Sequence, residues 1–348
     1  MTGIGLRYNN LSGVNLAGQS LANAAFNAAT LTNANLSQAN LTNANFVAAN
    51  LSSANLSQAN LTNAYFSGFS YPVYDENGEV IDEVVSSPGA NFTGANLSGA
   101  DARGATFYLA TLSGANTSNL IQSDGHIAGL DLTSGASLVV RDYENYAGID
   151  VPILVDQHLA MDATGTLRLV FDADLWDSTV SFAPGIPVAL GGTLELLFAA
   201  DVDLAGQLGR TLDLFDWTGV SPSGAFGVSS LYTWDLTMLY TTGEVTLTEL
   251  PFPGDANGDH VVDFTDLGIL LNNYSQAGTF ATGDFNNSGN VDFTDLGILL
   301  NNYNQTAPVF SPAAAVPEPN TLVLAGIGAI GLIVATRRKR AGRAACCQ

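Results

Sequence analysis

The chain has 348 residues, 47% of them hydrophobic, so it is long enough for two or three domains with buried cores. Residues 1–316 carry 31 acidic residues against five Arg and no Lys, a formal charge of −26. A surface of this charge attracts divalent cations and repels nucleic acid, which excludes DNA binding through a basic face.

Residues 11–66 repeat with a period of five. Leu or Phe occupies every fifth position, Ala stands two residues before most of them, and Asn usually lies between. The centres are Leu11, Leu16, Leu21, Phe26, Leu31, Leu36, Leu41, Phe46, Leu51, Leu56, Leu61 and Phe66. This period matches neither a helix nor a strand, so one long element of either kind is excluded. Self-similarity at a fixed period predicts a solenoid with one inward apolar residue on each short side.

A second run of the same pattern follows after a one-residue change of frame. Its centres are Phe92, Leu97, Ala102, Phe107 and Leu112. The string LTNANLSQANLTNANF resembles the pentapeptide-repeat family, whose chains wind a right-handed, four-sided β-helix. The resemblance implies that both the Leu or Phe and the Ala point inward, and that turns stack about 4.8 Å apart. We therefore predict a pentapeptide β-helix over residues 1–120.

The two runs are separated by an insert, residues 70–89. Asn77-Gly78 stands between two short apolar stretches, Val73-Tyr74 and Val80-Ile81. This arrangement predicts a β-hairpin with a type I′ turn, extruded from the solenoid.

Residues 121–250 contain short alternating apolar runs separated by Gly, Pro, Asp and Ser, which predicts an all-β sandwich or roll. The segment beginning GRTLDLFDW resembles a domain found before the sorting tail of exported planctomycete-type proteins. His126 and His158 are the catalytic candidates, and Asp156 shares a strand face with His158 by spacing. No nucleophile elbow, zinc-protease motif or phosphate loop occurs, so we expect no enzyme. Paired carboxylates for glycoside cleavage stay open, because this segment has many Asp.

Residues 255–274 and 284–303 are two copies of one pattern, with thirteen identical residues at an offset of 29. Oxygen-bearing side chains occupy loop positions 1, 3, 5, 9 and 12, and position 7 supplies a backbone carbonyl, which is a spacing that surrounds a hard cation. The first set is Asp255, Asn257, Asp259, Val261, Asp263 and Asp266, and the second is Asp284, Asn286, Ser288, Asn290, Asp292 and Asp295. Calcium is the predicted cofactor. His260 replaces the favoured Gly at position 6, which predicts a weaker first site.

This duplicated pattern resembles a type I dockerin, a small helical module of paired F-hand motifs, and we assign it residues 251–305. In each helix the spacing of Leu267, Leu270, Leu271 and Tyr274 predicts one buried stripe. The resemblance implies that a cohesin-type partner is bound at loop positions 10 and 11, which here are Phe264, Thr265, Phe293 and Thr294. A calcium clasp that stiffens the chain is the alternative role.

A linker, residues 306–315, precedes a tail over residues 316–343. The tail contains Val316, Pro317, Glu318 and Pro319, then an apolar stretch, then Arg337, Arg338, Lys339 and Arg340. The apolar stretch is a little shorter than the roughly 20 residues of a full membrane span, and the basic cluster would face the cytoplasm. This order resembles a PEP-CTERM sorting signal, which implies recognition by an exosortase and display with exopolysaccharide. A permanent transmembrane anchor is the alternative.

These patterns together predict an exported, non-catalytic structural or adhesive protein of the cell envelope, surface or extracellular matrix. The alternative is an exported polysaccharide-active protein, acting on glycosides, that joins a complex through its dockerin. A cleft holding two carboxylates and aromatic rings would favour that enzyme. Residues 1–13 have neither the charged start nor the apolar core of a signal peptide, so we expect the reading frame to begin further upstream.

Overall fold

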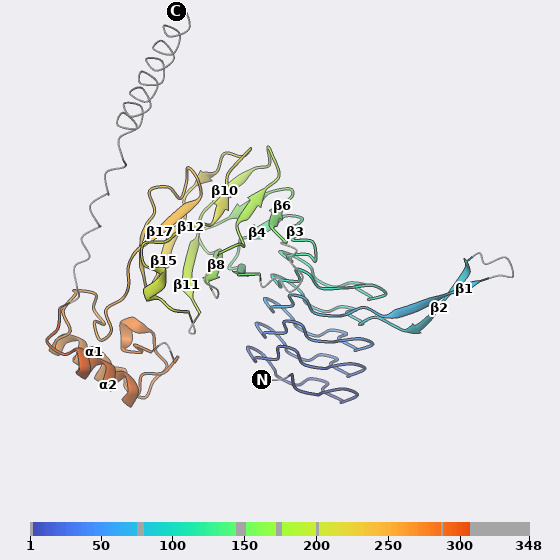
Figure 1. The fold of residues 1–348 in the computed structure, drawn as a ribbon, viewed down its shortest axis with the longest axis horizontal. Helices are drawn as coiled ribbons and strands as arrows, with labels where there is room; N and C mark the ends of the chain where they lie inside the picture. Colours follow the sequence, from blue (N-terminus) through green and yellow to red (C-terminus); the bar gives the residue numbers. More distant parts are fainter. Residues whose placement is uncertain are drawn as a thin grey trace, which may run out of the picture. The chain divides into compact units, whose positions relative to one another are not determined.

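The computed structural model describes residues 3–74, 80–143, 151–171, 176–199, 202–286 and 288–306 (Figure 1). Contacts between residues divide the chain into two compact units. The first comprises residues 1–251 with Asn286–Asn290, and the second comprises Phe252–Phe285 with the residues from Val291 onward. The first unit is built of β-structure and the second contains the two α-helices, so the protein is mainly β, as the sequence predicts.

Residues 5–121 wind into a coil in which each turn takes twenty residues. Parallel backbone bridges join Gly5 to Ala25 and Ala25 to Asn45. Four repeats of five therefore complete one turn, which confirms the four-sided pentapeptide β-helix. Each side ends in a tight turn that contains a positive φ, for example 57° at Asn43. Asn adopts this left-handed conformation more readily than most residues, whereas the Asn between Ala and Leu, such as Asn40, lies at a backbone bridge between turns.

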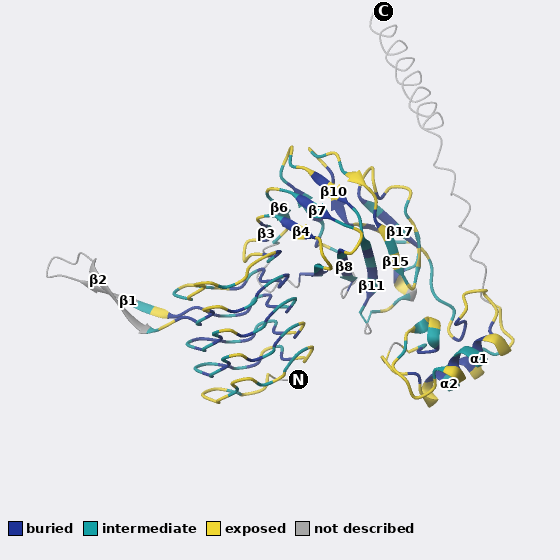
Figure 2. Cartoon of the chain, turned by 180° about the vertical axis from the view of Figure 1, so that it is seen from behind, coloured by how far each residue is buried: buried dark blue, intermediate teal, exposed yellow. Residues whose placement is uncertain are grey.

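The inward positions of the coil form a column of stacked side chains. Leu41 and Phe46 are fully buried, as are most of the other Leu, Phe and Ala of the two runs (Figure 2). The ring centres of Phe26 and Phe46 are 4.7 Å apart, and those of Phe46 and Phe66 are 5.0 Å apart. These rings stack because the residues are separated by one complete turn. Leu112 is 41% exposed, because no further four-sided turn covers it.

The insert leaves the backbone ladder of the coil unbroken. Asn50 bridges to Asn91 and Asn60 to Asp101, so this turn contains 41 residues in place of twenty. The insert contains β1 (Phe69–Tyr74) and β2 (Val80–Ser87), an antiparallel pair that projects from the coil (Figure 1). The 21 inserted residues exceed a multiple of five by one, which explains the change of frame by one residue. The expected turn at Asn77-Gly78 lies outside the described residues.

Beyond residue 121 the chain continues as a wider, three-sided coil of parallel strands. The first sheet contains β3 (His126–Ile127), β6 (Ile153–Val155), β9 (Val180–Phe182) and β13 (Phe215–Asp216). The second contains β4 (Leu130–Leu132), β7 (Leu159–Met161), β10 (Val188–Leu190) and β14 (Ser223–Gly224). The third contains β5 (Ser137–Arg141), β8 (Thr166–Phe171), β11 (Thr193–Phe198) and β15 (Gly227–Ser230). The predicted sandwich or roll is therefore wrong.

The error has a physical cause. Leu138, Leu167 and Leu194 lie in register on neighbouring strands, and all three are fully buried. A strand with one buried face alternates apolar and polar residues whether its neighbours are parallel or antiparallel, so the pattern does not distinguish the two. The parallel arrangement becomes visible only when whole turns are compared.

An antiparallel sheet is formed by segments before and after the last turn of the coil. It consists of β12 (Thr211–Asp213), β17 (Glu244–Glu249) and β16 (Thr233–Asp235), and a short 3₁₀ helix, η1 (Ala205–Gln207), precedes it. Leu212, Val245 and Leu247 of this sheet are buried in the same apolar core as the three-sided coil. The indole of Trp217 donates a hydrogen bond to the carbonyl of Leu239, at 2.8 Å. This sheet therefore extends the core of the coil.

The second unit contains α1 (Phe264–Asn272), η2 (Phe280–Thr282) and α2 (Phe293–Asn302). Its core is small and consists of four fully buried residues, Val262, Leu270, Val291 and Leu299. The predicted stripe is only partly correct, because Leu271 is 55% exposed and Tyr274 is 38% exposed. Leu271 lies about 100° round the helix from Leu270, and a core of four residues covers only a narrow face.

The two halves of this unit are joined by backbone hydrogen bonds that repeat with the sequence. The amide of Val262 donates to the carbonyl of Gln305, and the amide of Val291 donates to the carbonyl of Gln276. Val262 and Val291 are 29 residues apart, and so are Gln276 and Gln305. Each half thus pairs its loop with the segment after the other helix. None of the helices in the described residues is long and apolar enough to cross a membrane. The tail over residues 316–343, with its expected transmembrane helix, lies outside the described residues.

Candidate functional site

The first predicted metal loop is folded around Asp255, which is only 4% exposed. Its carboxylate accepts hydrogen bonds from the backbone amides of Gly258 at 2.7 Å, Asp259 at 3.2 Å and His260 at 2.8 Å. His260 reaches this position with a φ of 68°. The left-handed conformation costs a non-glycine residue roughly 1–2 kcal/mol, which supports the expectation that this loop is the weaker one.

Asp266 closes the same loop from the first turn of α1 and is fully buried. One carboxylate oxygen accepts hydrogen bonds from the amides of Ala256 at 2.8 Å and Asn257 at 3.2 Å. The other accepts the amide of Asp263 at 2.9 Å, completing a capping box with the helix N-cap. Positions 1 and 12 of the loop are thus both carboxylates held inward by backbone amides.

The remaining predicted ligands of this loop lie nearer the surface. The Asn257 amide oxygen accepts from the Asp259 backbone at 3.0 Å, and an Asp259 oxygen accepts from the amide of Val261 at 2.9 Å. Asp263 caps α1, accepting the Thr265 amide at 2.6 Å. That hydrogen bond lowers the pKa of the Asp263 carboxyl from its ordinary value. All six predicted positions therefore fall within one compact loop.

The second loop repeats the central features of the first. Asp284 is 1% exposed and Asp295 is fully buried. Asp295 accepts the amides of Phe285 and Asp292, each at 2.9 Å. The Ser288 amide donates to the side chain of Asn286 at 2.9 Å, and its hydroxyl donates to the carbonyl of Asn290 at 3.1 Å. Within the described residues, no three His, Cys, Asp or Glu side chains form a cluster that could hold a metal ion.

The donor set nevertheless suits a hard cation. Residues 251–306 contain no Lys or Arg, so this segment itself supplies no strong cation for its four buried carboxylates. Burying an ionised carboxylate is costly unless it is paired, hydrogen-bonded or bound to a metal. Carboxylate, amide and backbone carbonyl oxygens are the ligands that calcium takes in proteins, and two of them here, from Asn257 and Val261, are uncharged.

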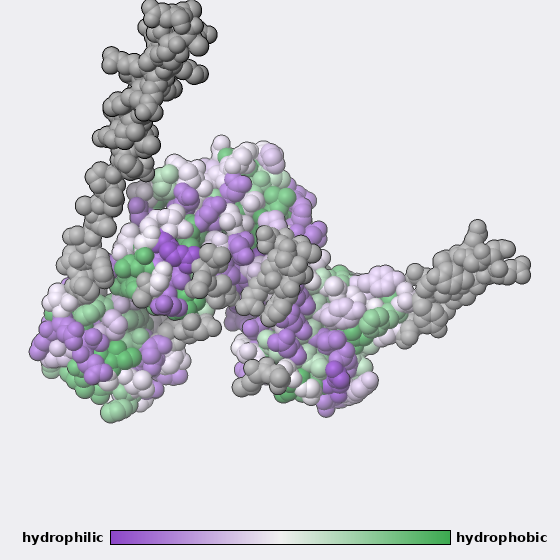
Figure 3. All heavy atoms as spheres, viewed as in Figure 1, coloured by the Kyte–Doolittle hydropathy of each residue, from purple (hydrophilic) through white to green (hydrophobic). Residues whose placement is uncertain are grey.

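The predicted partner-binding residues lie on the surface. Phe264 is 74% exposed and Phe293 is 75% exposed, although both are large aromatic residues. Thr265 and Thr294 are also exposed beside them. Sequence reasoning missed Leu271 and Leu300, which are 55% and 56% exposed. Each follows its Phe by seven residues, which places the Leu on the same helix face as the Phe. On the side of the helical unit that Figure 3 shows, green apolar residues lie among purple hydrophilic ones.

The two histidines of the three-sided coil each pair with an aspartate from a neighbouring turn. His126 Nδ1 lies 2.8 Å from Asp156, and His158 Nε2 lies 3.0 Å from Asp131. The sequence instead suggested Asp156 as the neighbour of His158. Parallel turns bring residues about thirty positions apart side by side. Each His therefore pairs with an Asp of the neighbouring turn and not with one of its own strand. Neither imidazole is hydrogen-bonded to a Ser, Thr or Cys side chain among the described residues.

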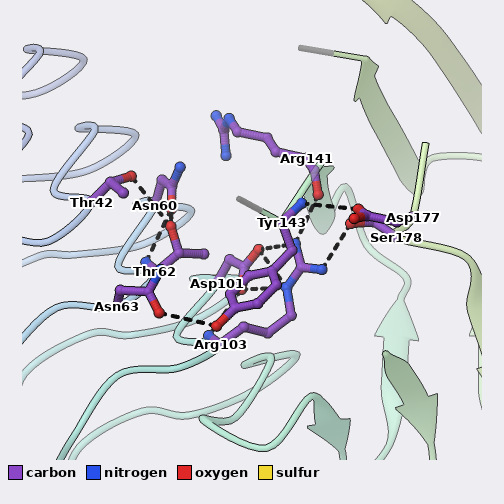
Figure 4. A network of polar contacts seen from close by, with 10 residues as sticks. All are labelled: Thr42, Asn60, Thr62, Asn63, Asp101, Arg103, Arg141, Tyr143, Asp177 and Ser178. Atoms are coloured by element: carbon purple, nitrogen blue, oxygen red, sulfur yellow. Dashed lines mark hydrogen bonds and ion pairs between the residues drawn. The ribbon is translucent and has the colours of Figure 1, made fainter. Parts of the chain in front are cut away.

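A buried ion pair joins the four-sided coil to the three-sided coil (Figure 4). Arg103 is fully buried and pairs with Asp101, at 2.7 Å from Nη2 to the carboxylate. Its Nη1 donates to the hydroxyl of Ser178 at 2.8 Å, and its Nη2 donates to the carbonyl of Arg141, also at 2.8 Å. The guanidinium carbon lies 5.1 Å from the ring centre of Tyr143. Residues from three segments of the chain, around Asp101, Arg141 and Ser178, therefore contact the side chain of Arg103.

The sequence contains an indication of the cluster around Arg103 that the five-residue pattern alone does not explain. Arg103 occupies the position after an inward residue, where the turn below has Thr62 and most repeats have Ser or Thr. The phenol of Tyr143 reaches back to the same coil and donates to the side chain of Asn63 at 3.0 Å. Burial raises the pKa of that phenol. Arg103, at a position that is usually Ser or Thr, therefore indicated the surface of the pentapeptide coil that the three-sided coil covers.

Comparisons with known proteins agree with the repeat and with the tail. A family model of pentapeptide repeats matches residues 10–46, 31–68 and 89–119, in eight copies. A model of the PEP-CTERM protein-sorting motif matches residues 315–339. The chain contains pentapeptide repeats and a PEP-CTERM sorting motif. The resemblance of residues 251–305 to a dockerin stays a prediction.

Solved structures similar to the chain are also pentapeptide repeat proteins. One, from the thylakoid lumen of Arabidopsis thaliana, is 25% identical with a TM-score of 0.26, and the match covers 32% of this chain and 64% of that one. Rfr23 from the cyanobacterium Cyanothece 51142 is 22% identical with a TM-score of 0.19, over 34% of this chain and 83% of its own. HetL, a pentapeptide repeat protein involved in heterocyst differentiation regulation in Nostoc sp. strain PCC 7120, is 26% identical with a TM-score of 0.16. The match covers 36% of this chain and 63% of HetL. No curated protein matches significantly.

The chain thus spans less than two thirds of the length of the Arabidopsis protein. The PEP-CTERM motif indicates exosortase-dependent sorting to the cell envelope or surface. The pentapeptide repeats indicate a structural protein.

Proposed function

We propose that this protein is a non-catalytic structural or adhesive component of the cell surface or extracellular matrix that binds two calcium ions. The observation that carries the calcium assignment is the burial of four carboxylates, Asp255, Asp266, Asp284 and Asp295, in a segment without Lys or Arg. The sorting motif supports the location, and the pentapeptide coil supports the structural role.

The first ion would be held by the side chains of Asp255, Asn257, Asp259, Asp263 and Asp266 with the carbonyl of Val261, and the second by the corresponding residues, 284–295. Calcium supplies positive charge that compensates buried carboxylates. Asp255 and Asp266 would keep their backbone hydrogen bonds, which orient their oxygens before an ion arrives. A loop ordered in advance loses less conformational entropy on binding.

Calcium should bind to the full chain with a stoichiometry of two, and Asp255→Ala and Asp284→Ala should each remove one site. Isothermal titration calorimetry measures the number of calcium ions bound by the wild type and by each variant. Calcium at about 100 times its dissociation constant should also stabilise the module by about 2.7 kcal/mol. Asp235→Ala is the matched control, because Asp235 is an exposed aspartate of β16 outside the module, and it should leave both sites intact. No calcium heat at millimolar concentration would refute the assignment.

The exposed Phe264, Thr265, Phe293 and Thr294 support a second part of the proposal, that the module docks to a cohesin-type partner. Because the two copies are identical over these residues, either helix could meet the partner. A calcium clasp without a partner is the competing role. It predicts that Phe264→Ser with Phe293→Ser leaves surface assembly unchanged.

The alternative of a glycoside-acting enzyme receives less support. A cavity of about 570 Å³ beside the last pentapeptide turn is lined by residues such as Leu112, Asn116 and Gln122, with no carboxylate and no aromatic ring. A second cavity, of about 220 Å³, contains one carboxylate, Glu195, and again no aromatic ring. Neither cavity brings together the pair of carboxylates that glycoside cleavage requires.

The sorting tail gives a further prediction. Deleting residues 317–348 from the native gene should release unprocessed protein into the medium, because the apolar stretch and Arg337–Arg340 would no longer hold the precursor in the membrane. Replacing Pro317, Glu318 and Pro319 by Ala should instead leave an uncleaved protein in the membrane. Mass spectrometry of envelope material distinguishes the outcomes. A mature chain that still ends in Cys346-Cys347-Gln348 would rule out cleavage and leave a simple anchor.

A further inference from the structure

A small polar cavity lies where the pentapeptide coil meets the third sheet of the three-sided coil. Its volume is about 220 Å³, and its lining comes from both coils. The pentapeptide side contributes Gln38 and Gln58, and the sheet side contributes Ser137, Thr166, Arg168 and Glu195. All six of these side chains can form hydrogen bonds, and Gly135 and Val139 complete the lining.

The groups that line the cavity hold one another in place and still keep hydrogen-bonding capacity. Arg168 Nε lies 2.5 Å from Glu195, an ion pair whose side chains are 42% and 26% exposed. Gln38 donates to Gln58 at 3.0 Å, and Gln58 in turn donates to the hydroxyl of Ser137. Among the described residues, the terminal nitrogens of Arg168 and the second oxygen of Glu195 have no hydrogen-bond partner. Hydrogen-bond donors of Arg168 and an acceptor of Glu195 therefore lie side by side at the cavity, in positions fixed by their ion pair.

One more hydroxyl, that of Thr193, continues the polar lining across the sheet beyond the cavity. Ser137, Thr166 and Thr193 lie in register on β5, β8 and β11, and these positions alternate with buried leucines. Adjacent strands are about 4.8 Å apart, so the three residues form a row of hydroxyls that crosses the strands. The lining of the cavity is the beginning of this row. A ligand with hydroxyls repeated along its length would match it.

The chemistry of the cavity selects among such ligands. The charge of Arg168 is compensated by Glu195, and residues 1–316 carry a formal charge of −26, so an anionic polymer would be repelled. The polar lining offers little apolar surface to a lipid or an apolar peptide. The volume of about 220 Å³ is below the roughly 300–1,000 Å³ of pockets for drug-sized ligands, so the cavity suits a ligand of about one sugar ring.

We propose that this cavity binds one sugar residue of a neutral polysaccharide, whose chain continues along the hydroxyl row of β5, β8 and β11. Arg168 and Glu195 bind vicinal hydroxyls of the ring as donor and acceptor, and Gln38 and Ser137 contact its edge. The proposal deepens the proposed function, on which it rests, because it gives the surface protein a defined site for matrix polysaccharide. No bond is made or broken at this site.

Affinity electrophoresis of the full chain tests the proposal, in gels that contain dextran, galactomannan, xyloglucan or alginate. At least one of the three neutral polymers should retard the protein, and alginate, which is anionic, should not. Glu195→Gln and Arg168→Met should each weaken retardation at least tenfold, since hydrogen bonds to charged groups are among the strongest. Glu244→Gln, an exchange of the same kind on β17, is the control and should behave like the wild type.

Three results would overturn the site. The first is the absence of retardation by every neutral polymer, the second is retardation by alginate alone, and the third is retardation unchanged in both cavity variants. Calcium binding and envelope location are measured on the same protein, so failure of the proposed function is recognised separately. Loss of those two properties in the wild type would contradict the function, whereas their persistence without polymer binding would contradict only this site.

Discussion

Replacing Phe46 by Asp should unfold the pentapeptide coil. Phe46 is fully buried, and its ring is stacked between those of Phe26, at 4.7 Å, and Phe66, at 5.0 Å. Removing a buried Phe costs about 3–5 kcal/mol, and an unpaired carboxylate in its place adds a desolvation cost of several kcal/mol. The sum is comparable with the whole stability of a typical domain. Urea unfolding followed by circular dichroism would measure the loss.

The matched control is Asn43→Asp, which places the same charge in the same turn of the coil. Asn43 is half-buried on the outer side, and its φ of 57° is tolerated by Asp about as well as by Asn. The free energy of unfolding should therefore change by less than about 0.5 kcal/mol. If Phe46→Asp and Asn43→Asp were equally harmless, the inward register of the five-residue repeat would be incorrect.

Replacing Arg103 by Met should destabilise the first unit by about 3–5 kcal/mol, because Asp101 would remain as a buried charge without its partner. The substitution also removes the hydrogen bonds to Ser178 and to the carbonyl of Arg141, which join the two coils. Adding Asp101→Asn removes the orphaned charge. The double variant should therefore recover a large part of the loss, giving a coupling energy above about 1 kcal/mol in a double-mutant cycle.

Arg168→Met is the comparison for Arg103→Met, since it breaks an ion pair of the same chemistry at a partly exposed site. Pairs of that kind contribute about 0–1 kcal/mol. Chemical unfolding of both variants would show whether burial makes the difference. Equal losses for the two variants would mean that the Arg103 cluster does not hold the coils together.

The pentapeptide coil could be predicted from the sequence because each repeat has the same surroundings. Leu41 and Phe46 contact residues twenty positions away that belong to the same pattern. The five-residue period of the sequence therefore predicts which residues are buried in the folded coil. The ladder even survives an insert of 21 residues, which appears in the sequence as a change of frame. The calcium sites stay a prediction, which rests on a short spacing of oxygen-bearing residues that occurs twice in the sequence.

Only the tertiary structure decided the rest. In the three-sided coil, successive turns take 28, 27 and 35 residues, as the pairs His126–Leu154, Ile153–Val180 and Val180–Phe215 show. Because this coil has no constant period, neither its parallel sheets nor the pairing of His126 with Asp156 can be predicted from a short segment of sequence. The burial of Arg103 likewise depends on segments about 40 and 75 residues further along the chain. Local patterns report the face that a strand buries, whereas its partner is chosen by contacts between distant residues.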